Sequence, residues 1–404
     1  MSGVFTRLVG QTAVESELVG AASAARGDPA HGVGDTGSMT HAWLITGPPG
    51  SGRSVAALCF SAALQCTSTG VPGCGQCRSC TTAMAGTHAD VRRVIPEGLS
   101  IKVDEMRSIV AAAARRPSTG RWQIVVIEDA DRLTEGAANA LLKVVEEPPP
   151  STVFLLCAPT VDPEDIAVTL RSRCRHVALR TPSAADIARV LVERDGLDEG
   201  DARLAASVSG GHVGRARRLA TDPEARARRA AALGLPRDAV TPSRAYAAVE
   251  ELLAAAEAEV VAVTVARDEA ETEELRVALG AGGTGKGTAG ALRGSAGVLK
   301  ELQDQQKSRR TRARRDAVDR ALIDLAGYFR DALMVAGGAD AVTASHPDMT
   351  EQVIALAGHA SQDRLLRCLE AVLTCREALA ANVKPKFALD AMVATVGQAL
   401  RTGR

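Results

Sequence analysis

The pattern of apolar positions divides the chain into two kinds of sequence. Between residues 43 and 179, short apolar runs alternate with segments of helical periodicity, which is typical of a parallel sheet with crossover helices. The runs occupy residues 43–46, 91–95, 124–127, 153–157 and 176–179. A helix from Thr12 and a loop rich in Gly, Asp and Ser near 26–39 precede them. We therefore predict an α/β domain over residues 1–180.

Beyond Pro182 the strand pattern stops and helical patterns continue to the end of the chain. Residues 184–194 and 201–208 predict short helices, and a Gly-containing loop at 209–214 precedes a basic helix, so we predict a small helical lid over residues 181–235. Residues 240–404 predict long helices rich in Ala and Leu, and hence an all-α domain. Its Gly-rich stretch at 280–297 predicts a flexible insert near 280–300 without a packed element.

Composition narrows the classes of partner. With 404 residues, 46% of them apolar, the chain can bury a core in each predicted domain. Lys plus Arg and Asp plus Glu both number 48, so no net field attracts the whole molecule to nucleic acid or an anionic membrane. Aromatic residues make up 2%, which disfavours base-stacking platforms. The beginning has no apolar signal core and no run reaches about 18 apolar residues, so we expect a cytoplasmic protein without membrane contact.

A phosphate loop follows the first predicted strand. The segment GPPGSGRS from Gly47 to Ser54 opens a helix, and in this context backbone N–H groups cradle phosphates. The predicted nucleotide-binding residues here are Gly47, Gly50, Gly52, Arg53 and Ser54. Arg53 stands where the motif has the lysine that reaches the β and γ phosphates, and a forked guanidinium does not replace a compact ammonium. The loop therefore predicts possible binding of ATP and Mg²⁺ but poor hydrolysis.

Two acids after the strand at 124–127 add to this site. A Walker B segment places Asp for the magnesium ion and then Glu to orient water, whereas here Glu128 precedes Asp129. Glu128 extends one methylene further toward the metal and Asp129 one methylene less toward the water. The exchange keeps the charge of the nucleotide site but alters its geometry.

Four cysteines have metal-ligand spacing. Cys66, Cys74, Cys77 and Cys80 follow the pattern C-x7-C-x2-C-x2-C, which supplies four thiolates to one tetrahedral ion. An iron–sulfur cluster is the alternative, but its motif continues with x3-C-P, and Thr-Thr-Ala-Met follows Cys80. We therefore predict structural Zn²⁺. The other cysteines are dispersed and predict small buried side chains.

The order of these motifs resembles a known family. GPPGSG, the four-cysteine module after the first helix, NALLKVVEEP at 139–148 and LRSRC at 170–174 occur in this order in bacterial replicative clamp loaders of the AAA+ type. Within that family the chain looks like the delta-prime type of DNA polymerase III subunit. The similarity covers residues 8–220, and NVKPKFALD at 382–390 is similar to the end of the family's collar domain.

The resemblance implies a function for individual residues. Arg173 corresponds to the arginine finger that reaches ATP bound by a neighbouring subunit, and Thr160 falls near the family's polar sensor. The sensor arginine of motor subunits would fall near Gly214, which is not an arginine. A delta-prime subunit would act as a stator with weak or no ATPase activity of its own. Its partners would be gamma/tau and delta type subunits, and, through the complex, the sliding clamp and primed DNA.

Two other functional interpretations of the sequence stay open. A gamma/tau type ATPase motor or another AAA+ remodeller would carry Lys, Asp then Glu, and a lid arginine in register, none of which is in place. A zinc-stabilised DNA-binding module is disfavoured by the balanced charge and the few aromatic residues. Residues 280–287, GAGGTGKG, imitate a phosphate loop without a preceding strand and predict a linker. The basic run at 307–315 predicts a solvated helix face rather than a DNA contact.

Overall fold

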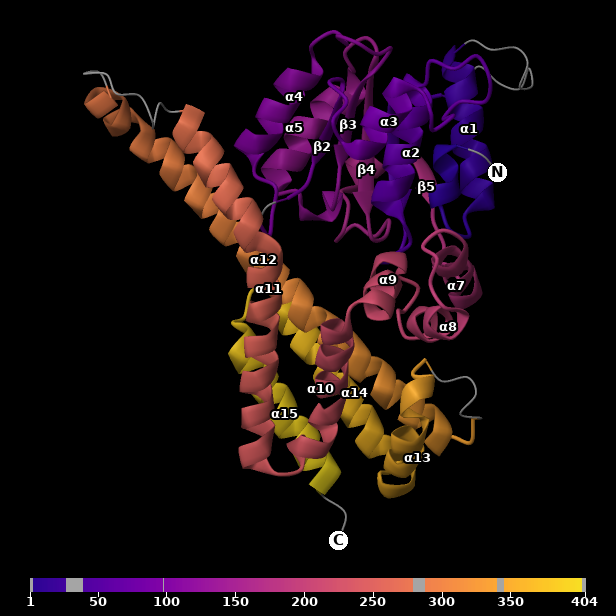
Figure 1. Ribbon diagram of the computed structural model, residues 1–404, viewed down its shortest axis with the longest axis vertical. Coiled ribbons are helices and arrows are strands. Elements are labelled where there is room, and N and C mark those ends of the chain that lie inside the picture. The colour runs from indigo at the N-terminus through magenta and orange to yellow at the C-terminus, as the bar shows by residue number, and fades with distance from the viewer. Residues whose placement is uncertain (1–2, 27–38, 97, 279–287, 340–344, 402–404) are drawn as a thin grey trace. The chain divides into compact units, whose positions relative to one another are not determined.

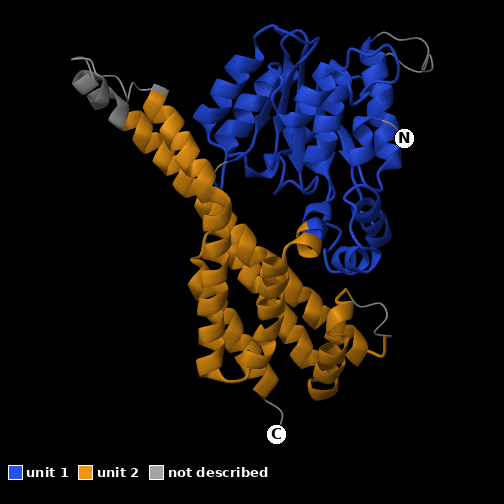
Figure 2. Ribbon diagram, in the orientation of Figure 1, with its two compact units in different colours: residues 1–217 blue, residues 218–404 orange. Residues whose placement is uncertain are grey.

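The chain forms two compact units in the computed structural model, residues 1–217 and 218–404 (Figure 2). The structure describes residues 3–26, 39–96, 98–278, 288–339 and 345–401. Each unit has its own apolar core, and each is described below by itself.

A five-stranded parallel sheet forms the centre of unit 1 (Figure 1). Its strands are β1 (Ala42–Thr46), β2 (Val91–Val94), β3 (Gln123–Ile127), β4 (Thr152–Ala158) and β5 (Arg175–Ala178), in the order β2-β3-β4-β1-β5. Every residue of β1 and β4 is buried. Continuous apolar strands of this kind are expected where helices cover both faces of a parallel sheet.

Helices cover the sheet on both faces. α1 (Thr12–Arg26), α2 (Arg53–Gln65) and α3 (Arg78–Ala85) contribute to one core cluster, together with Trp43 and Ile45 of β1. α4 (Val103–Ala113), α5 (Glu135–Glu146) and α6 (Val168–Arg171) contribute to the other, together with Ala42 and Leu44. Alternate residues of a strand point to opposite faces, so β1 anchors both cores. Short 3-10 helices lie at Val4–Arg7 (η1) and Ala130–Arg132 (η3).

Short helices follow the sheet. α7 (Ala184–Glu193) and α8 (Glu199–Ser207) begin at side-chain caps, since Ser183 and Asp198 accept hydrogen bonds from backbone N–H groups of the first turn. α9 (Val213–Thr221) crosses the boundary between the units. The predicted lid over 181–235 and the domain limits at 180 and 240 stay predictions.

Unit 2 is helical in all of its described secondary structure. It contains α10 (Pro223–Ala239), α11 (Pro242–Ala278), α12 (Thr288–Ala336), η5 (Pro347–Met349), α13 (Thr350–His359), α14 (Gln362–Ala380) and α15 (Pro385–Arg401). Its core includes Val249, Leu322, Phe329, Leu365 and Leu389. The longest helices are α11, with 37 residues, and α12, with 49.

The fold class predicted from the sequence is confirmed: an α/β domain with a parallel sheet precedes an all-helical region. The prediction for residues 280–297 is wrong from Thr288 onward, because α12 begins there. Residues 279–287, which include the imitation phosphate loop, lie outside the described residues. Among the described helices, none combines the length and the hydropathy needed to cross a membrane.

Candidate nucleotide site and metal centre

The phosphate loop joins β1 to α2, as its motif predicts. Gly52 caps α2 with φ 97°, and Gly50 has φ 87°, conformations that side chains with a Cβ rarely adopt. A Cβ at Gly50 would lie 2.5 Å from the Cβ of His212. His212, in the loop before α9, therefore approaches the phosphate loop closely. No sequence motif pointed to His212.

Arg53 is bound within its own loop. Its guanidinium donates a short hydrogen bond to the carbonyl of Gly47, and its Nη2 lies 3.9 Å from Oδ1 of Asp129. The side chain is 14% exposed. The cation in the place of the motif's lysine is thus directed to partners of this chain, and a phosphate would have to compete with them.

Glu128 lies at the end of β3, opposite Ser54. The Ser54 hydroxyl donates to Oε2 of Glu128 at 2.8 Å, and Arg93 pairs with Oε1 at 2.6 Å. Asp129 has φ 54°, a left-handed conformation that costs about 1–3 kcal/mol and is concentrated at functional sites. The structure thus brings the phosphate loop, Glu128 and Asp129 together, with both carboxylates next to arginines of the chain.

The hydroxyl of Thr160 belongs to a turn of its own. It donates to Oδ2 of Asp165 at 2.6 Å and accepts from the backbone N–H of Asp162 at 2.9 Å. The backbone next to Thr160 does contact the phosphate loop: the N–H of Gly47 donates to the carbonyl of Pro159 at 3.1 Å. The structure therefore does not direct the predicted sensor hydroxyl toward the phosphate loop.

Arg173 lies just after α6 and is partly exposed. Its Nη2 is 2.6 Å from Oε1 of Glu146, at the end of α5, and the two side chains are 38% and 42% exposed. Its Nη1 donates to the carbonyl of Thr169 at 3.0 Å and to the Ser172 hydroxyl at 3.2 Å. Burial raises the pKa of the neighbouring Cys174 to about 12, so this half-buried side chain is a neutral thiol packed against the core.

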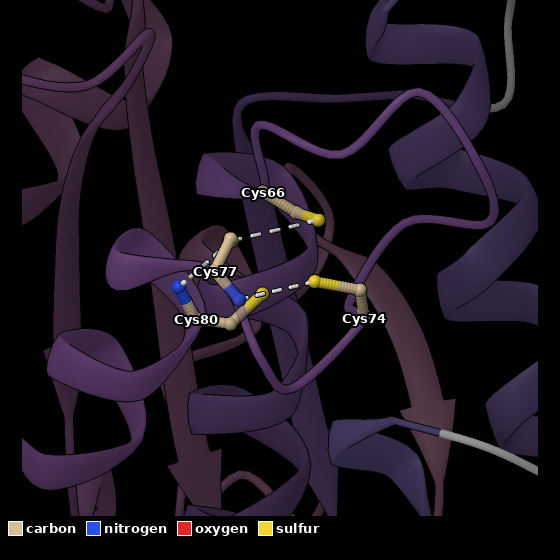
Figure 3. A group of neighbouring side chains, drawn as sticks. All are labelled: Cys66, Cys74, Cys77 and Cys80. Atoms are coloured by element: carbon tan, nitrogen blue, oxygen red, sulfur yellow. Dashed lines mark hydrogen bonds between the residues drawn. The ribbon is translucent and has the colours of Figure 1, made fainter.

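The four predicted metal ligands form one cluster (Figure 3). Cys66 caps the end of α2, Cys77 caps the beginning of α3, Cys80 lies within α3, and Cys74 lies in the connecting loop. Their sulfur atoms lie within 4.8 Å of one another, and those of Cys66 and Cys77 are 4.0 Å apart. A tetrahedral ion with four bonds of about 2.3 Å needs sulfur atoms roughly 3.8 Å apart. The cluster fits a metal ion.

Hydrogen bonds hold the cysteine loop in place and lower the pKa of Cys66 and Cys77, whereas burial raises the pKa of Cys80. Arg26 donates to the carbonyls of Cys66, Ser68 and Gly70 at 2.8–3.0 Å. Burial alone would raise the pKa of Cys77, but hydrogen bonds from the backbones of Thr67 and Cys80 outweigh it and lower the pKa to about 6. The thiolate is the form of cysteine that binds metal.

Two parts of the chain match family models of a replicative polymerase. Residues 33–183 match a model described as DNA polymerase III, delta subunit, and residues 314–389 match one described as DNA polymerase III, delta subunit, C terminal. The first range contains the phosphate loop, the cysteine cluster and Arg173, whereas Arg26 and His212 lie outside it.

Individual relatives match over part of the chain. The chain is 40% identical to DNA polymerase III subunit delta' of Escherichia coli over 145 residues, 35% of this chain and 43% of that protein. It is 36% identical to the subunit delta' of Pseudomonas aeruginosa over 156 residues, 38% of this chain and 47% of that protein. DNA polymerase III subunit tau of Bacillus subtilis is 34% identical over 179 residues, 43% of this chain and 31% of that protein.

The chain therefore spans less than half the length of these relatives. A solved gamma subunit-related protein of DNA polymerase III from Thermotoga maritima covers 89% of this chain and 94% of its own, with 17% identity and a TM-score of 0.39. The resemblance to DNA polymerase III subunits of the delta-prime type, predicted from the sequence motifs, is confirmed by the family and relative matches.

Proposed function

We propose that this chain is a delta-prime type subunit of the DNA polymerase III clamp loader. In this proposal it is a stator: its helical C-terminal region joins the other loader subunits, of the gamma/tau and delta types, and Arg173 acts on ATP held by a neighbour. The loader would place the sliding clamp on primed DNA. The matches to delta' relatives at 36% and 40% identity support this assignment.

The observation that carries the stator role is the internal pairing of the nucleotide site. Arg53 is held by Gly47 and Asp129, and Glu128 by Ser54 and Arg93. An incoming nucleotide would have to break these contacts, and each charged hydrogen bond is worth about 1.5–3 kcal/mol. We therefore infer weak ATP binding by this chain and little or no hydrolysis.

In contrast to Arg53, Arg173 is partly exposed and only weakly held by its own chain. Its ion pair with Glu146 is partly exposed, and exposed pairs contribute only about 0–1 kcal/mol. The guanidinium can therefore exchange Glu146 for a phosphoryl group of a neighbouring subunit at little cost. Arginine fingers stabilise the charge of a transferring phosphoryl group and accelerate the reaction by about 10³–10⁵ in other systems.

We propose that Cys66, Cys74, Cys77 and Cys80 hold Zn²⁺. Four thiolates leave no open coordination position, so the ion would be structural and would fasten the loop between α2 and α3. Cys66 and Cys80 belong to the core cluster that α1, α2 and α3 form on one face of the sheet, so the ion would also stabilise packing near α1 and η1.

Reconstitution tests the proposed function. The chain is mixed with the gamma/tau and delta subunits of the same organism, and loading of the clamp on primed DNA is measured with and without it. We expect the chain to elute with the other subunits and loading to require it. Full loading without the chain would contradict the proposal, and ATP turnover by the isolated chain at the rate of the complex would favour the motor reading instead.

A further inference from the structure

The two longest helices of unit 2 extend past its core as a helical arm. The arm consists of residues 261–278 of α11 and 297–313 of α12 (Figures 1 and 2). The last buried apolar residue of α11 is Val260, and the apolar core of unit 2 begins on α12 at Val318. Neither family-model match, 33–183 or 314–389, includes the arm. The family matches therefore assign no role to the arm.

Polar side chains occupy the contact between the two helices of the arm. Thr264, Asp268 and Gln306 are buried. The Gln306 amide donates to the carbonyl of Asp268 at 2.9 Å and to the Thr272 hydroxyl at 3.1 Å. Arg309 pairs with Asp268 at 2.8 Å. These hydrogen bonds and this ion pair join the two helices of the arm across the buried contact.

Several aliphatic side chains of the arm are exposed, whereas Val265, Leu275, Leu299 and Leu302 are half-buried. Val263 is 67% exposed and Val277 is 61% exposed, and Ala266 and Ala270 are exposed between them. Positions 263, 266, 270 and 277 are three, four and seven residues apart, which puts them on one face of α11. The stripe is about 21 Å long. Exposed valines at this spacing indicate a helix-docking face better than single scattered apolar residues would.

A groove adjoins this stripe. It has a volume of about 600 Å³ and lies between α11 and α12, where Leu275, Val298 and Leu302 line it together with Glu271, Glu274 and Glu301. Glu274 also lines a second hollow, next to Ala270 and Val277 of the stripe. Stripe and groove thus adjoin at Glu274 and form one mixed surface near the end of the arm, with apolar side chains between glutamates.

Acidic residues border that surface. Outside the buried contact, residues 266–277 and 297–305 carry six acids against three bases. The acids are Glu269, Glu271, Glu273, Glu274, Glu301 and Asp304, and the bases are Arg267, Arg276 and Lys300. Arg267 and Arg309 pair with Glu271 at 2.8 Å and 2.5 Å, and Arg276 lies 4.0 Å from Glu273, so the excess rests on Glu269, Glu274, Glu301 and Asp304. The border therefore has an excess of negative charge, which favours a partner with Lys or Arg on both sides of an apolar seam.

We propose that the arm docks an amphipathic helix of another protein, with aliphatic residues three and four positions apart and flanking Lys or Arg. A helix laid along an apolar groove is a common mode of recognition. A second copy of this chain fits less well, because a symmetric contact would bring the same acidic border against itself.

Two synthetic peptides test the proposal on the full chain. Both have Leu at alternating spacings of three and four, one with flanking Lys and the other with flanking Glu, and binding is followed by fluorescence anisotropy. We expect the Lys peptide to bind at least about tenfold more tightly than the Glu peptide, a difference of about 1.4 kcal/mol. Val263→Ser with Val277→Ser, and separately Glu274→Gln with Glu301→Gln, should each weaken binding of the Lys peptide about tenfold.

Matched controls lie on other helices of unit 2. Ile354→Ser on α13 removes an exposed apolar side chain, and Glu370→Gln on α14 removes an exposed charge; neither should change binding. Circular dichroism checks that every variant is folded. Equal binding of the two peptides, no binding of either, or binding unaffected by the arm substitutions would each overturn the proposal. Self-association of the chain that the arm substitutions abolish would identify a second copy as the occupant and overturn it as well.

Discussion

Single residues decide whether the phosphate loop works as an ATPase site. The sequence predicted a weakened site from Arg53 and from the order of Glu128 and Asp129, and the structure adds the contacts that use these groups within the chain. The approach of His212 to Gly50 and the hydrogen bond of Thr160 to Asp165 could not be predicted. The first depends on the packing of segments far apart in the sequence, and the second on a side-chain rotamer.

The Arg53→Ala substitution tests whether the phosphate loop of this chain contributes to ATP turnover by the complex. Because the guanidinium is committed to Gly47 and Asp129, its loss should change ATP turnover of the reconstituted complex by less than about twofold, or 0.4 kcal/mol in the barrier. Steady-state ATP hydrolysis measures this. A loss of tenfold or more would show that the phosphate loop of this chain takes part in turnover.

His346 predicts a pH dependence for unit 2. Burial alone would lower its pKa, but the carboxylates of Asp324, 3.7 Å away, and Asp331, hydrogen-bonded at 3.1 Å, outweigh burial and the nearby Arg229, and the pKa is raised. A raised folded pKa stabilises the folded state fully below the unfolded value of about 6.5, and the gain is lost as pH rises through the folded pKa.

Chemical denaturation between pH 5.5 and 9 measures this effect. The free energy of unfolding that His346→Gln removes should be largest at the acidic end and should shrink toward the alkaline end. His359→Gln, at an exposed position of α13, serves as the control. A difference between wild type and His346→Gln that grows with pH would contradict the assignment.

At the scale of elements, the parallel sheet was predicted well. The predicted run 153–157 became β4 at Thr152–Ala158, because a buried parallel strand is a nearly continuous apolar run. The predicted run 91–95 became β2 at Val91–Val94, an edge strand whose two arginines are exposed. The beginning of α12 at Thr288 was missed. Glycine lowers helix propensity by about 1 kcal/mol per residue, and this local signal did not decide the structure of a segment that continues into a long helix.

The cysteine loop is an element whose stability should depend on metal. We expect one zinc ion per chain by elemental analysis, and Cys77→Ser should remove it and lower the free energy of unfolding by about 3 kcal/mol or more. Ser79→Ala, in the same helix, should retain the ion. Unchanged stability after Cys77→Ser would remove the structural role of the metal.

The contact between the phosphate loop and His212 can be measured with a pair of glycine substitutions. Gly50 and Gly196 both have left-handed φ, but only a Cβ at Gly50 meets atoms of another segment, those of His212. Gly196→Ala should cost about 1 kcal/mol of backbone strain. Gly50→Ala should cost about 1–3 kcal/mol more, because it also overpacks the contact. If both substitutions lower the free energy of unfolding equally, the loop before α9 moves aside from the new Cβ without a measurable cost.

At the scale of the whole molecule, the two units contribute differently to the proposed role. Unit 1 contains the matched range 33–183 with its internally paired nucleotide site, its metal cluster and Arg173. Unit 2 contains the second matched range, 314–389, and the arm outside it. The motifs of unit 1 could be predicted from sequence because each is local. The arm could not, since its docking face depends on which side of α11 turns away from α12.

The central claim is that this chain acts in its neighbour's active site. ATP hydrolysis and clamp loading by the reconstituted complex, with Arg173→Ala against the neighbouring exposed Arg171→Ala, test it most directly. We predict that Arg173→Ala assembles normally but lowers clamp loading at least tenfold, a conservative fraction of the effect of an arginine finger. Arg171→Ala should retain full activity. Full loading and unchanged ATP turnover with Arg173→Ala would contradict the claim.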